Sequence, residues 1–515
     1  MLRRHLRLAL LTATLLLPAA PAALATDGVL DIVAPWEIGS MDPAKHGYVF
    51  TRLQIAETLV EVDDGGALRP GLAEAWEVTA DGLAWRFRIR DGVRFHDGTA
   101  LTADAAAQAL RHAQGKPGLL AQAPIEAIEA DGKAVVIRLR QPYAVLAAVL
   151  AGTANQILAP SSYAADGTVT QVIGTGPYRI VDLQPPQKLT AARVEEYWGG
   201  APAIEHVTFL AAGRGETRAM LAESGDADIV FTLDPASKAR MARNDAVTVH
   251  SVPIARTVTL KVNAGHPFLA DPRVRKAISL ALDRRGIATA ILREPEAAAD
   301  QLFPPTLADW HLPDATTAAT AATSADPQAA AALLAEAGWS TGADGILVRD
   351  GKPFQVTLRT FSDRPELPLL ATAMQAQLRE VGIDLRVAVG NSSEIPSGHR
   401  DGSLELALLA RNFALVPDPL ATVQQDFGSG GNDWGAMNWR NARLTEILET
   451  LMRGVADDAQ RKQLRREAAQ ILAVELPVVP VTWYQQTAAV SKGVAGFTID
   501  PFERSYRISD MRWAK

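Results

Sequence analysis

The sequence contains no cysteine in 515 residues. No disulfide can therefore cross-link the fold, and no cysteine can carry the lipid of an exported lipoprotein. Basic runs are also absent beyond the N-terminus, since 51 Lys and Arg face 58 Asp and Glu, a net charge of −7. Such a chain offers nucleic acid no cationic surface. Stability must come from packing, and the length is sufficient for two or three domains.

Motifs of catalysis are missing as well. The nine histidines are scattered, without an HExxH motif or a spacing typical of metal ligands. The glycine motif GTGP (174–177) precedes a strand-like run rather than a helix, so we interpret it as a turn and not as a phosphate-binding loop. There is no G-x-S-x-G motif, and no carboxylate pair stands out. The sequence therefore predicts no enzyme, no metal site and no cofactor.

The N-terminus has the features of an export signal. Three arginines precede an apolar run at 8–17, and the Ala-Leu-Ala sequence at 23–25 fits the small residues that signal peptidase prefers. The run is too short to span a bilayer. We predict a signal peptide at 1–25, ordinary secretion, and a soluble periplasmic protein that is neither a lipoprotein nor anchored to the membrane. An N-terminal amphipathic helix is the alternative, but no polar face interrupts the run.

The pattern of the remaining chain alternates short strands with helices. Strict alternation at 85–95 predicts a strand and a hairpin. The segment 271–287 predicts one helix, because Asp271 can cap it and Pro272 suits its first turn. The segment 326–339 repeats this arrangement. Further along, we predict a strand at 354–361, a helix at 369–382 and a strand at 383–390. The fold class is therefore α/β.

Five stretches of the sequence, in the same order along the chain, resemble one known family. These stretches are 68–110, 173–180, 195–209, 271–287 and 333–339. They look like the successive signatures of the peptide/nickel class of ABC-transporter solute-binding proteins, family 5. The resemblance extends over nearly all of the mature chain, and five signatures in register are highly specific.

That resemblance implies a two-lobed clamshell of the type II periplasmic-binding-protein class, with an extra domain inserted in the first lobe. The implied boundaries are 26–62, 175–262 and 482–515 for lobe I, 63–174 for the extra domain, and 263–481 for lobe II. The two crossings between the lobes would form the hinge, at Val262, Asn263, Val481 and Thr482.

The resemblance also implies a function. Such a protein is the substrate-binding component of an ABC importer, which captures a peptide-like ligand in the periplasm by lobe closure and delivers it to the membrane permease. Its partners would be the permease and the ATPase subunits, and we expect a monomer. A nickel or metal-chelate binding protein of the same class is the alternative. An exported enzyme built on a clamshell scaffold is a second one, and the sequence shows no residues for it.

The loop at 411–431 is the predicted ligand loop. In peptide binders of the resembled family an Asp of this loop pairs with the α-amino group of the ligand. Counting back from Asp418 places that position at Leu415, and Phe413 stands where an aromatic side chain lines the pocket. The loop would then hold a ligand without a free α-ammonium group, or the ammonium would bind elsewhere. If the register differs by one to three residues, Asp418 or Asp426 would serve instead.

Other candidate contacts come from separate segments. Nickel-binding members of the resembled family carry an Arg where this chain offers Asn155 and Gln156, which leaves nickel binding open. Aromatic side chains can line such a pocket and present a polar tip. The predicted ligand-binding residues are His46, Tyr48, Arg411, Phe413, Leu415, Asp418, Trp434, Trp439 and Tyr484.

Overall fold

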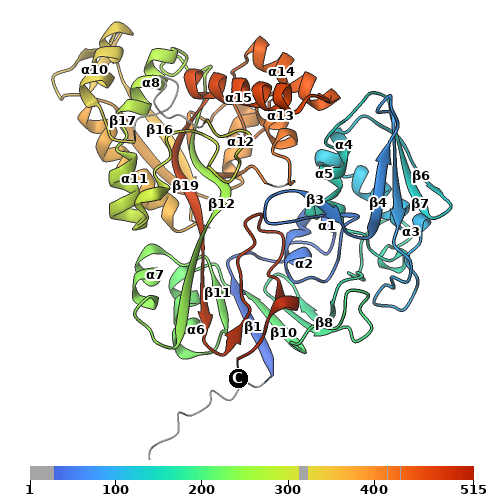
Figure 1. The fold of residues 1–515 in the computed structure, drawn as a ribbon. Coiled ribbons are helices and arrows are strands. Elements are labelled where there is room, and N and C mark those ends of the chain that lie inside the picture. Colours follow the sequence, from blue (N-terminus) through green and yellow to red (C-terminus); the bar gives the residue numbers. More distant parts are fainter. Residues whose placement is uncertain (1–27, 313–322, 363, 415, 430, 515) are drawn as a thin grey trace, which may run out of the picture.

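The computed structural model describes residues 28–312, 323–362, 364–414, 416–429 and 431–514 (Figure 1). The predicted signal peptide at 1–25 and Leu415 lie outside these residues. In the part of the chain that is described, no helix has the length and apolar character to cross a membrane.

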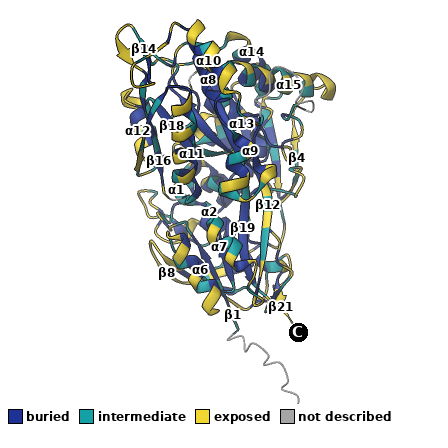
Figure 2. Cartoon of the chain, turned by 90° about the vertical axis from the view of Figure 1, so that its left-hand side faces the viewer, coloured by how far each residue is buried: buried dark blue, intermediate teal, exposed yellow. Residues whose placement is uncertain are grey.

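A ten-stranded sheet runs through the whole molecule, in the order β17-β16-β18-β12-β19-β11-β1-β10-β9-β8. Its strands are mostly buried, while the helices expose their outer faces (Figure 2). The strands are β1 (Val29–Ala34), β8 (Tyr178–Gln184), β9 (Lys188–Arg193), β10 (His206–Ala211), β11 (Ile229–Phe231), β12 (Val247–Val262), β16 (Gln355–Phe361), β17 (Asp384–Gly390), β18 (Leu406–Asn412) and β19 (Val478–Ser491).

The sheet divides into two lobes, which confirms the predicted α/β clamshell. In the lower lobe of Figure 1, β1 runs parallel to β10 and β11, and helices α6 (Gly215–Ser224) and α7 (Pro235–Met241) pack beside them. In the upper lobe, β16 runs parallel to β17 and β18 and packs against α11 (Glu366–Glu380). The long antiparallel strands β12 and β19 connect the two lobes.

The ladder between β12 and β19 is irregular where the strands pass from one lobe to the other. Pro253 pairs with Gln485 and Thr257 pairs with Trp483, so three residues of β12 lie opposite the single residue Tyr484. Extra residues of this kind disrupt the ladder and bend the strand. Beyond the irregularity, residues 256–262 also pair with β18 of the upper lobe.

The predicted hinge residues lie on the upper-lobe side of this irregularity. Val262 ends β12, and the Asn263 side chain donates a hydrogen bond to the Leu404 carbonyl at 2.8 Å. Val481 and Thr482 are fully buried and lie at a second irregularity, because Val258 pairs with Thr482 and Thr259 pairs with Pro480, so that Val481 is skipped in the ladder. The positions of the hinge and of the domain boundaries stay predictions, and the ladder is irregular at two places, opposite Tyr484 and at Val481.

A separate small sheet forms the domain at the right of Figure 1. Its order is β4-β5-β7-β6, and α3 packs against it. The bounds are β4 (Ala73–Val78), β5 (Ala84–Ile89), β6 (Ile125–Asp131), β7 (Ala134–Leu139) and α3 (Ala103–Gln114). The hairpin predicted around 85–95 is present, with Gly82 in the left-handed region at φ 72°. The domain touches the upper lobe, where the Ala144 amide donates to the Met452 carbonyl at 2.8 Å.

The helix predicted at 271–287 is two helices, α8 (Pro272–Leu280) and α9 (Arg284–Ile287). Asp271 caps the first as predicted, but Asp283 caps a new helix by accepting from the Gly286 amide at 2.9 Å. The buried Arg284 guanidinium donates to the carbonyls of Ser279 and Leu282, which satisfies the end of α8. A long helix was therefore the wrong interpretation, because a second cap and a buried donor end it early.

The other predicted elements are confirmed. The segment 326–339 contains α10 (Pro327–Glu336), capped by Asp326 and followed by Gly338 at φ 84°. The GTGP turn leads into β8, as predicted. The remaining elements are α1 (Pro43–His46), α2 (Tyr48–Arg52), α4 (Leu119–Gln122), α5 (Leu146–Leu150), α12 (Glu394–Asp401), α13 (Leu420–Phe427), α14 (Ala442–Arg453), α15 (Asp458–Glu475), the 3-10 and π turns η1 (Thr153–Asn155), η2 (Pro160–Ser162), η3 (Ala288–Leu292), η4 (Pro295–Ala297) and η5 (Ile508–Asp510), and the short strands β2 (Val60–Val62), β3 (Leu68–Pro70), β13 (Ser340–Thr341), β14 (Leu347–Arg349), β15 (Lys352–Pro353), β20 (Val494–Ala495) and β21 (Arg512–Trp513).

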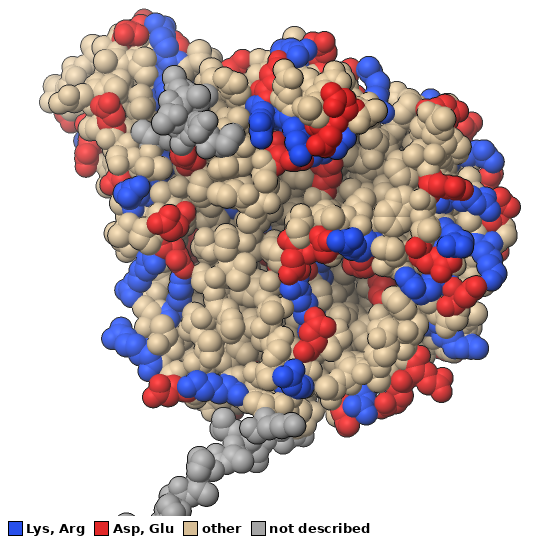
Figure 3. Space-filling model, viewed as in Figure 1, with Lys and Arg blue, Asp and Glu red and all other residues tan. Residues whose placement is uncertain are grey.

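The surface charge is mixed. On the face shown in Figure 3, Lys and Arg side chains lie among Asp and Glu side chains, without a broad area of one sign. Between α14 and α15, Arg443 pairs with Glu467 at 2.7 Å. Exposed pairs of this kind contribute little to stability individually.

Candidate ligand site between the lobes

The carboxyl ends of the parallel strands of both lobes lie close to β12 and β19 at one place. We call β12 and β19 the crossing strands. In the lower lobe, β11 ends at Phe231, and the next residues bond to β19: the Leu233 amide donates to the Thr487 hydroxyl at 3.0 Å. In the upper lobe, β18 leads into Phe413, whose amide donates to the Ala255 carbonyl of β12 at 2.9 Å. In open α/β sheets, ligands bind outside the carboxyl ends of the strands. This junction is therefore the candidate site.

A buried ion cluster joins the lobes at this junction. The Glu503 carboxylate of the C-terminal segment pairs with Arg52 of α2 at 3.5 Å and with Arg256 of β12. The Asn412 side chain at the end of β18 donates to the same carboxylate at 3.0 Å. The three charged side chains are 9%, 8% and 5% exposed, in the order Arg52, Arg256 and Glu503. Two cations thus share one anion, away from solvent.

The cluster continues along β19 into the upper lobe. The guanidinium carbons of Arg256 and Arg364 lie 5.4 and 4.9 Å from the centre of the Tyr484 ring. Glu366, which begins α11, is 8% exposed. Burial raises the pKa of its carboxyl, although the nearby Arg364 opposes this shift. We call the following residues the junction cluster: Arg52, Arg256, Arg364, Glu366, Tyr484 and Glu503.

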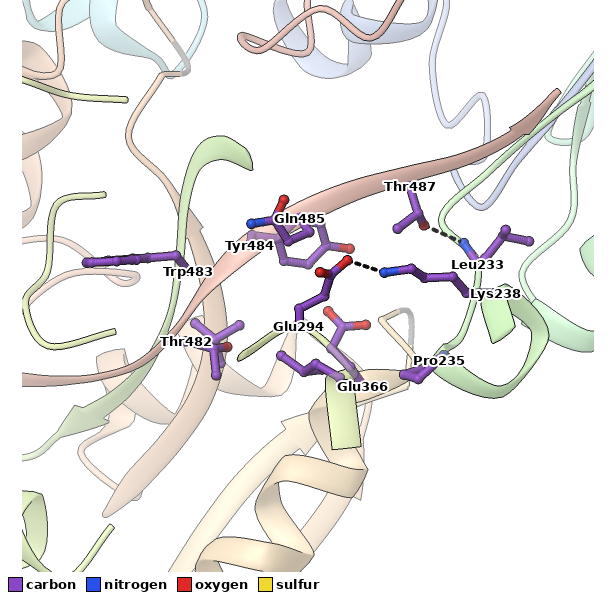
Figure 4. A pocket seen from close by; sticks show the side chains of 12 residues that line it. Leu233, Pro235, Lys238, Glu294, Glu366, Thr482, Trp483, Tyr484, Gln485 and Thr487 are labelled. Carbon is purple, nitrogen blue, oxygen red and sulfur yellow. Dashed lines mark hydrogen bonds and ion pairs between the residues drawn. The ribbon is translucent and has the colours of Figure 1, made fainter. Parts of the chain in front are cut away.

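A pocket opens beside the upper-lobe part of the junction cluster (Figure 4). Glu366, Thr482 and Tyr484 are among the residues that line it. Lys238 of α7 reaches across it to form an ion pair with Glu294, which comes from the upper lobe. The pocket is therefore enclosed by side chains of both lobes and of the crossing strands.

Several buried polar atoms at the junction have no hydrogen-bond partner among the described residues. Leaving such an atom unpaired costs about 1–3 kcal/mol, so a native fold retains few of them without a reason. They come from the lower lobe, the upper lobe and both crossing strands. The atoms are Arg52 Nη1, Asp234 Oδ2, Arg256 Nε, Glu366 Oε1, Thr482 Oγ1, Gln486 Oε1 and Glu503 Oε1.

Two residues at the same junction have a strained backbone. Thr232, just after β11, has φ 59°, and Glu503 has φ 56°. The left-handed region is unfavourable for a β-branched residue such as threonine, and costs of roughly 1–3 kcal/mol are tolerated mainly at functional sites. Gln486 holds Thr232 in place by donating to its hydroxyl at 3.2 Å, and Arg218 donates to its carbonyl.

The carboxylates of the predicted ligand loop are already engaged. Asp426 forms a two-pronged ion pair with Arg411, at 2.6 and 2.7 Å, and its side chain is 1% exposed. Asp418 pairs with Arg465 at 2.7 Å and also accepts from the amide of Leu420 at 3.0 Å. Neither carboxylate is left for a ligand in this arrangement.

The other predicted contacts divide between the junction and the core. Tyr484 belongs to the junction cluster, and Tyr48 adjoins it, with the Arg52 guanidinium 5.3 Å from its ring. His46 lies next to Tyr48, with 6.0 Å between the ring centres. Phe413 is buried against Phe303, with 5.2 Å between their rings.

The two predicted tryptophans are held by the upper lobe. Trp439 donates its indole N–H to Glu475 at 2.8 Å, and Trp434 packs against the core of the upper lobe. Asn155 and Gln156, in the segment compared with nickel binders, donate to the carbonyls of Val149 and Thr153. These side chains thus have structural partners, and their role in binding a ligand stays a prediction.

Most of the junction cluster was missed by the sequence analysis. Arg52, Arg256, Arg364, Glu366 and Glu503 come from four separate segments of the chain, so no local spacing connects them. One signal was present: Arg256 directly follows the apolar residues 252–255 within a strand, where a charge must find a buried partner. Among the described residues, no three His, Asp or Glu side chains are grouped so that they could hold a metal ion.

Comparison with known proteins gives consistent matches along the chain. Residues 67–434 match the model of bacterial extracellular solute-binding proteins, family 5 Middle. The nickel-binding periplasmic protein of Escherichia coli K12 is 28% identical over 485 residues, which is 90% of each chain. A glutathione-binding protein of Escherichia coli O1:K1 is 24% identical over 86% of each chain. The crystal structure of NikA from Brucella suis with Fe(III)-EDTA has a TM-score of 0.84 and 25% identity, covering 94% of this chain and all of that one.

Proposed function

We propose that this chain, which belongs to family 5 of the bacterial extracellular solute-binding proteins, captures a peptide-like solute between its lobes as the substrate-binding component of an ABC importer. The observation that carries the proposal is the junction, where both lobes present buried polar atoms without partners among the described residues. Buried polar groups need hydrogen bonds, and a polar solute enclosed by the lobes would supply them.

The two-lobed architecture explains how a solute would be captured. A solute that bonds to both lobes favours the closed arrangement, because only that arrangement brings all of its partners together. The closed protein would then be recognised by a membrane permease, whose ATPase subunits provide the energy. The chain itself performs no covalent step in this scheme. One of the relatives is named a periplasmic protein, and we propose a periplasmic monomer released from its signal peptide.

A solute carried through purification would test this proposal. The mature protein should be purified without denaturation, and then unfolded to release small molecules for mass spectrometry and metal analysis. We expect one polar solute in a stoichiometric amount. A protein that carries no solute, and binds none from a periplasmic extract, would contradict the proposal.

A metal chelate is the second candidate solute, because one relative is named a nickel-binding protein and a similar structure holds Fe(III)-EDTA. A protein cage for a bare divalent ion requires several His or carboxylate ligands, and the described residues offer no such group. Any metal would therefore enter with its own chelator.

This gives a prediction for nickel alone. Calorimetric titration of the mature protein with aqueous Ni²⁺ should show no tight binding, because the ion would lose its water ligands without gaining enough protein ligands. His46 is the one histidine among the predicted ligand-binding residues, and its ring lies beside that of Tyr48. Submicromolar binding of the ion that is abolished by His46→Ala would overturn this expectation.

A further inference from the structure

One ion pair connects the two lobes outside the junction cluster. Lys238 belongs to α7 of the lower lobe, and Glu294 belongs to the turn between η3 and η4 of the upper lobe. In Figure 1, α7 lies to the left of the crossing strands, whereas the domain built on the small sheet lies to their right. Figure 4 shows the two side chains meeting in the pocket near Tyr484. The pair therefore joins the lobes on the side away from the small domain.

Two donors of the lower lobe bind Glu294. The Lys238 amine and the Ser251 hydroxyl both donate to its Oε1, the hydroxyl at 2.9 Å. Ser251 lies in the lower-lobe part of β12, before the irregularity opposite Tyr484. The side chains of Lys238 and Glu294 are 19% and 28% exposed. Because water screens this pair only in part, its attraction is stronger than that of a fully exposed pair.

The backbone of the upper lobe fixes the position of Glu294. Its amide donates to the Ala288 carbonyl at 3.0 Å. Leu292, two residues earlier, packs against the upper-lobe core. Arg293, between them, takes the left-handed conformation at φ 60°, which is unfavourable for a residue with a side chain. The carboxylate is therefore carried by the upper lobe in a constrained turn.

Lys238 is attached to the lower lobe in a similar way. Asp234 caps α7 by accepting from the Ser237 amide at 2.9 Å. Met241, at the other end of the helix, is buried among side chains of the lower lobe. The distance between Lys238 and Glu294 thus follows the orientation of one lobe relative to the other.

The ion pair belongs to the closed arrangement of the lobes. On the other side of the crossing strands, the lobes also touch, where the Ala144 amide donates to the Met452 carbonyl at 2.8 Å. The lobes are therefore together on both sides in this structure. Because α7 and the turn that carries Glu294 are attached to different lobes, a rotation that opens the lobes would separate Glu294 from Lys238.

We propose that Lys238 and Glu294 form a latch that sets how often the lobes are closed in the absence of a solute. This proposal rests on the proposed function, since it concerns the lobe closure by which a solute is captured. The apparent affinity for a solute that binds the closed arrangement depends on the fraction of molecules that are closed. The latch would therefore also set how tightly the solute is retained.

A second ion pair of α7 provides the matched control. Arg240 pairs with Glu223 of α6, so both partners belong to the lower lobe, and their side chains are 53% and 33% exposed. Arg240→Glu reverses a charge on the same helix as Lys238→Glu does. An effect on helix α7 alone would appear in both variants, whereas an effect on the lobes should appear only in Lys238→Glu.

Single-molecule fluorescence energy transfer measures the open and closed populations directly. The chain has no cysteine of its own, so the dyes can be attached to Val181→Cys and Val389→Cys. These residues are 60% and 53% exposed and lie in β8 and β17, at opposite ends of the ten-stranded sheet. The full mature chain is first freed of carried solute. We expect Lys238→Glu to lower the ratio of closed to open molecules at least about threefold, which is within the range of one ion pair.

A charge swap assigns the effect to the pair itself. Lys238→Glu combined with Glu294→Lys should restore the parent ratio, because the Ser251 hydroxyl can accept from the new lysine as well as donate. Arg240→Glu should leave the ratio unchanged. If Lys238→Glu fails to fold, Lys238→Met replaces it. Equal populations in the parent and the Lys238 variant, a swap that does not restore the ratio, or an equal shift in Arg240→Glu would overturn the proposal.

A failure of the latch is distinct from a failure of the proposed function. If the solute released from the purified protein closes the parent and Lys238→Glu equally well, and their populations without solute are also equal, only the latch is wrong. If the protein carries no solute and binds none from a periplasmic extract, the transport role itself is contradicted.

Discussion

Asp426→Asn should destabilise the upper lobe by about 3–5 kcal/mol, the usual cost of removing one partner of a buried ion pair. The Arg411 side chain is 12% exposed, and both of its bonds to Asp426 would be lost or weakened. For a domain of this size the change corresponds to a fall of roughly 6–20 °C in melting temperature. Differential scanning calorimetry of the variant and the parent measures it.

A second charge in the upper lobe adds to this effect. Burial lowers the pKa of Lys261 to about 7, and the nearby Asp426 partly offsets that shift. Without the carboxylate of Asp426, the ammonium form of Lys261 becomes more costly. The destabilisation of Asp426→Asn should therefore be larger at pH 6, where the lysine is protonated in the parent, than at pH 9.

Asp418→Asn is the matched control. It makes the same chemical change in the same loop, but the Asp418 side chain is 26% exposed and Arg465 keeps a second partner in Asp309, at 2.8 Å. An asparagine can still accept from the Leu420 amide. We expect a loss of at most about 1 kcal/mol. If the two variants were equally stable, Asp426 would not be the structural partner of Arg411.

The local fold was predictable where one residue type has a clear conformational preference. Asp326 caps α10, Gly338 takes φ 84° after it, and Gly82 takes φ 72° in the hairpin turn. The break between α8 and α9 was not predictable, because it depends on the buried Arg284, which also bonds to the Pro480 carbonyl from a distant strand. Local propensity depends on residues that are close in the sequence, whereas this contact joins two residues that are 196 positions apart.

The site was less predictable than the fold for a similar reason. The family resemblance predicted the ligand loop at 411–431. Tyr484 belongs to the junction cluster, and Arg411 lies next to it, opposite Thr257 of β12. The sequence could not show that Asp426 would be bonded to Arg411, nor that Glu366 would face the pocket. Both facts depend on how separate strands end at one place in the sheet.

Lobe closure is the second large effect that we expect. A solute that contacts the junction in both lobes connects the lower lobe, the crossing strands and the upper lobe. Because it binds the folded, closed protein and not the unfolded chain, a concentration of one hundred times Kd should add roughly 2.7 kcal/mol of stability. The melting temperature should therefore rise with solute concentration.

The central claim is that the solute is captured by closure of the two lobes at the crossing strands. Small-angle X-ray scattering tests it most directly, on the mature protein stripped of solute and on the same protein with the solute identified by mass spectrometry. We expect a smaller radius of gyration in the presence of the solute, together with the rise in melting temperature. Tight binding that leaves the scattering curve unchanged would contradict it.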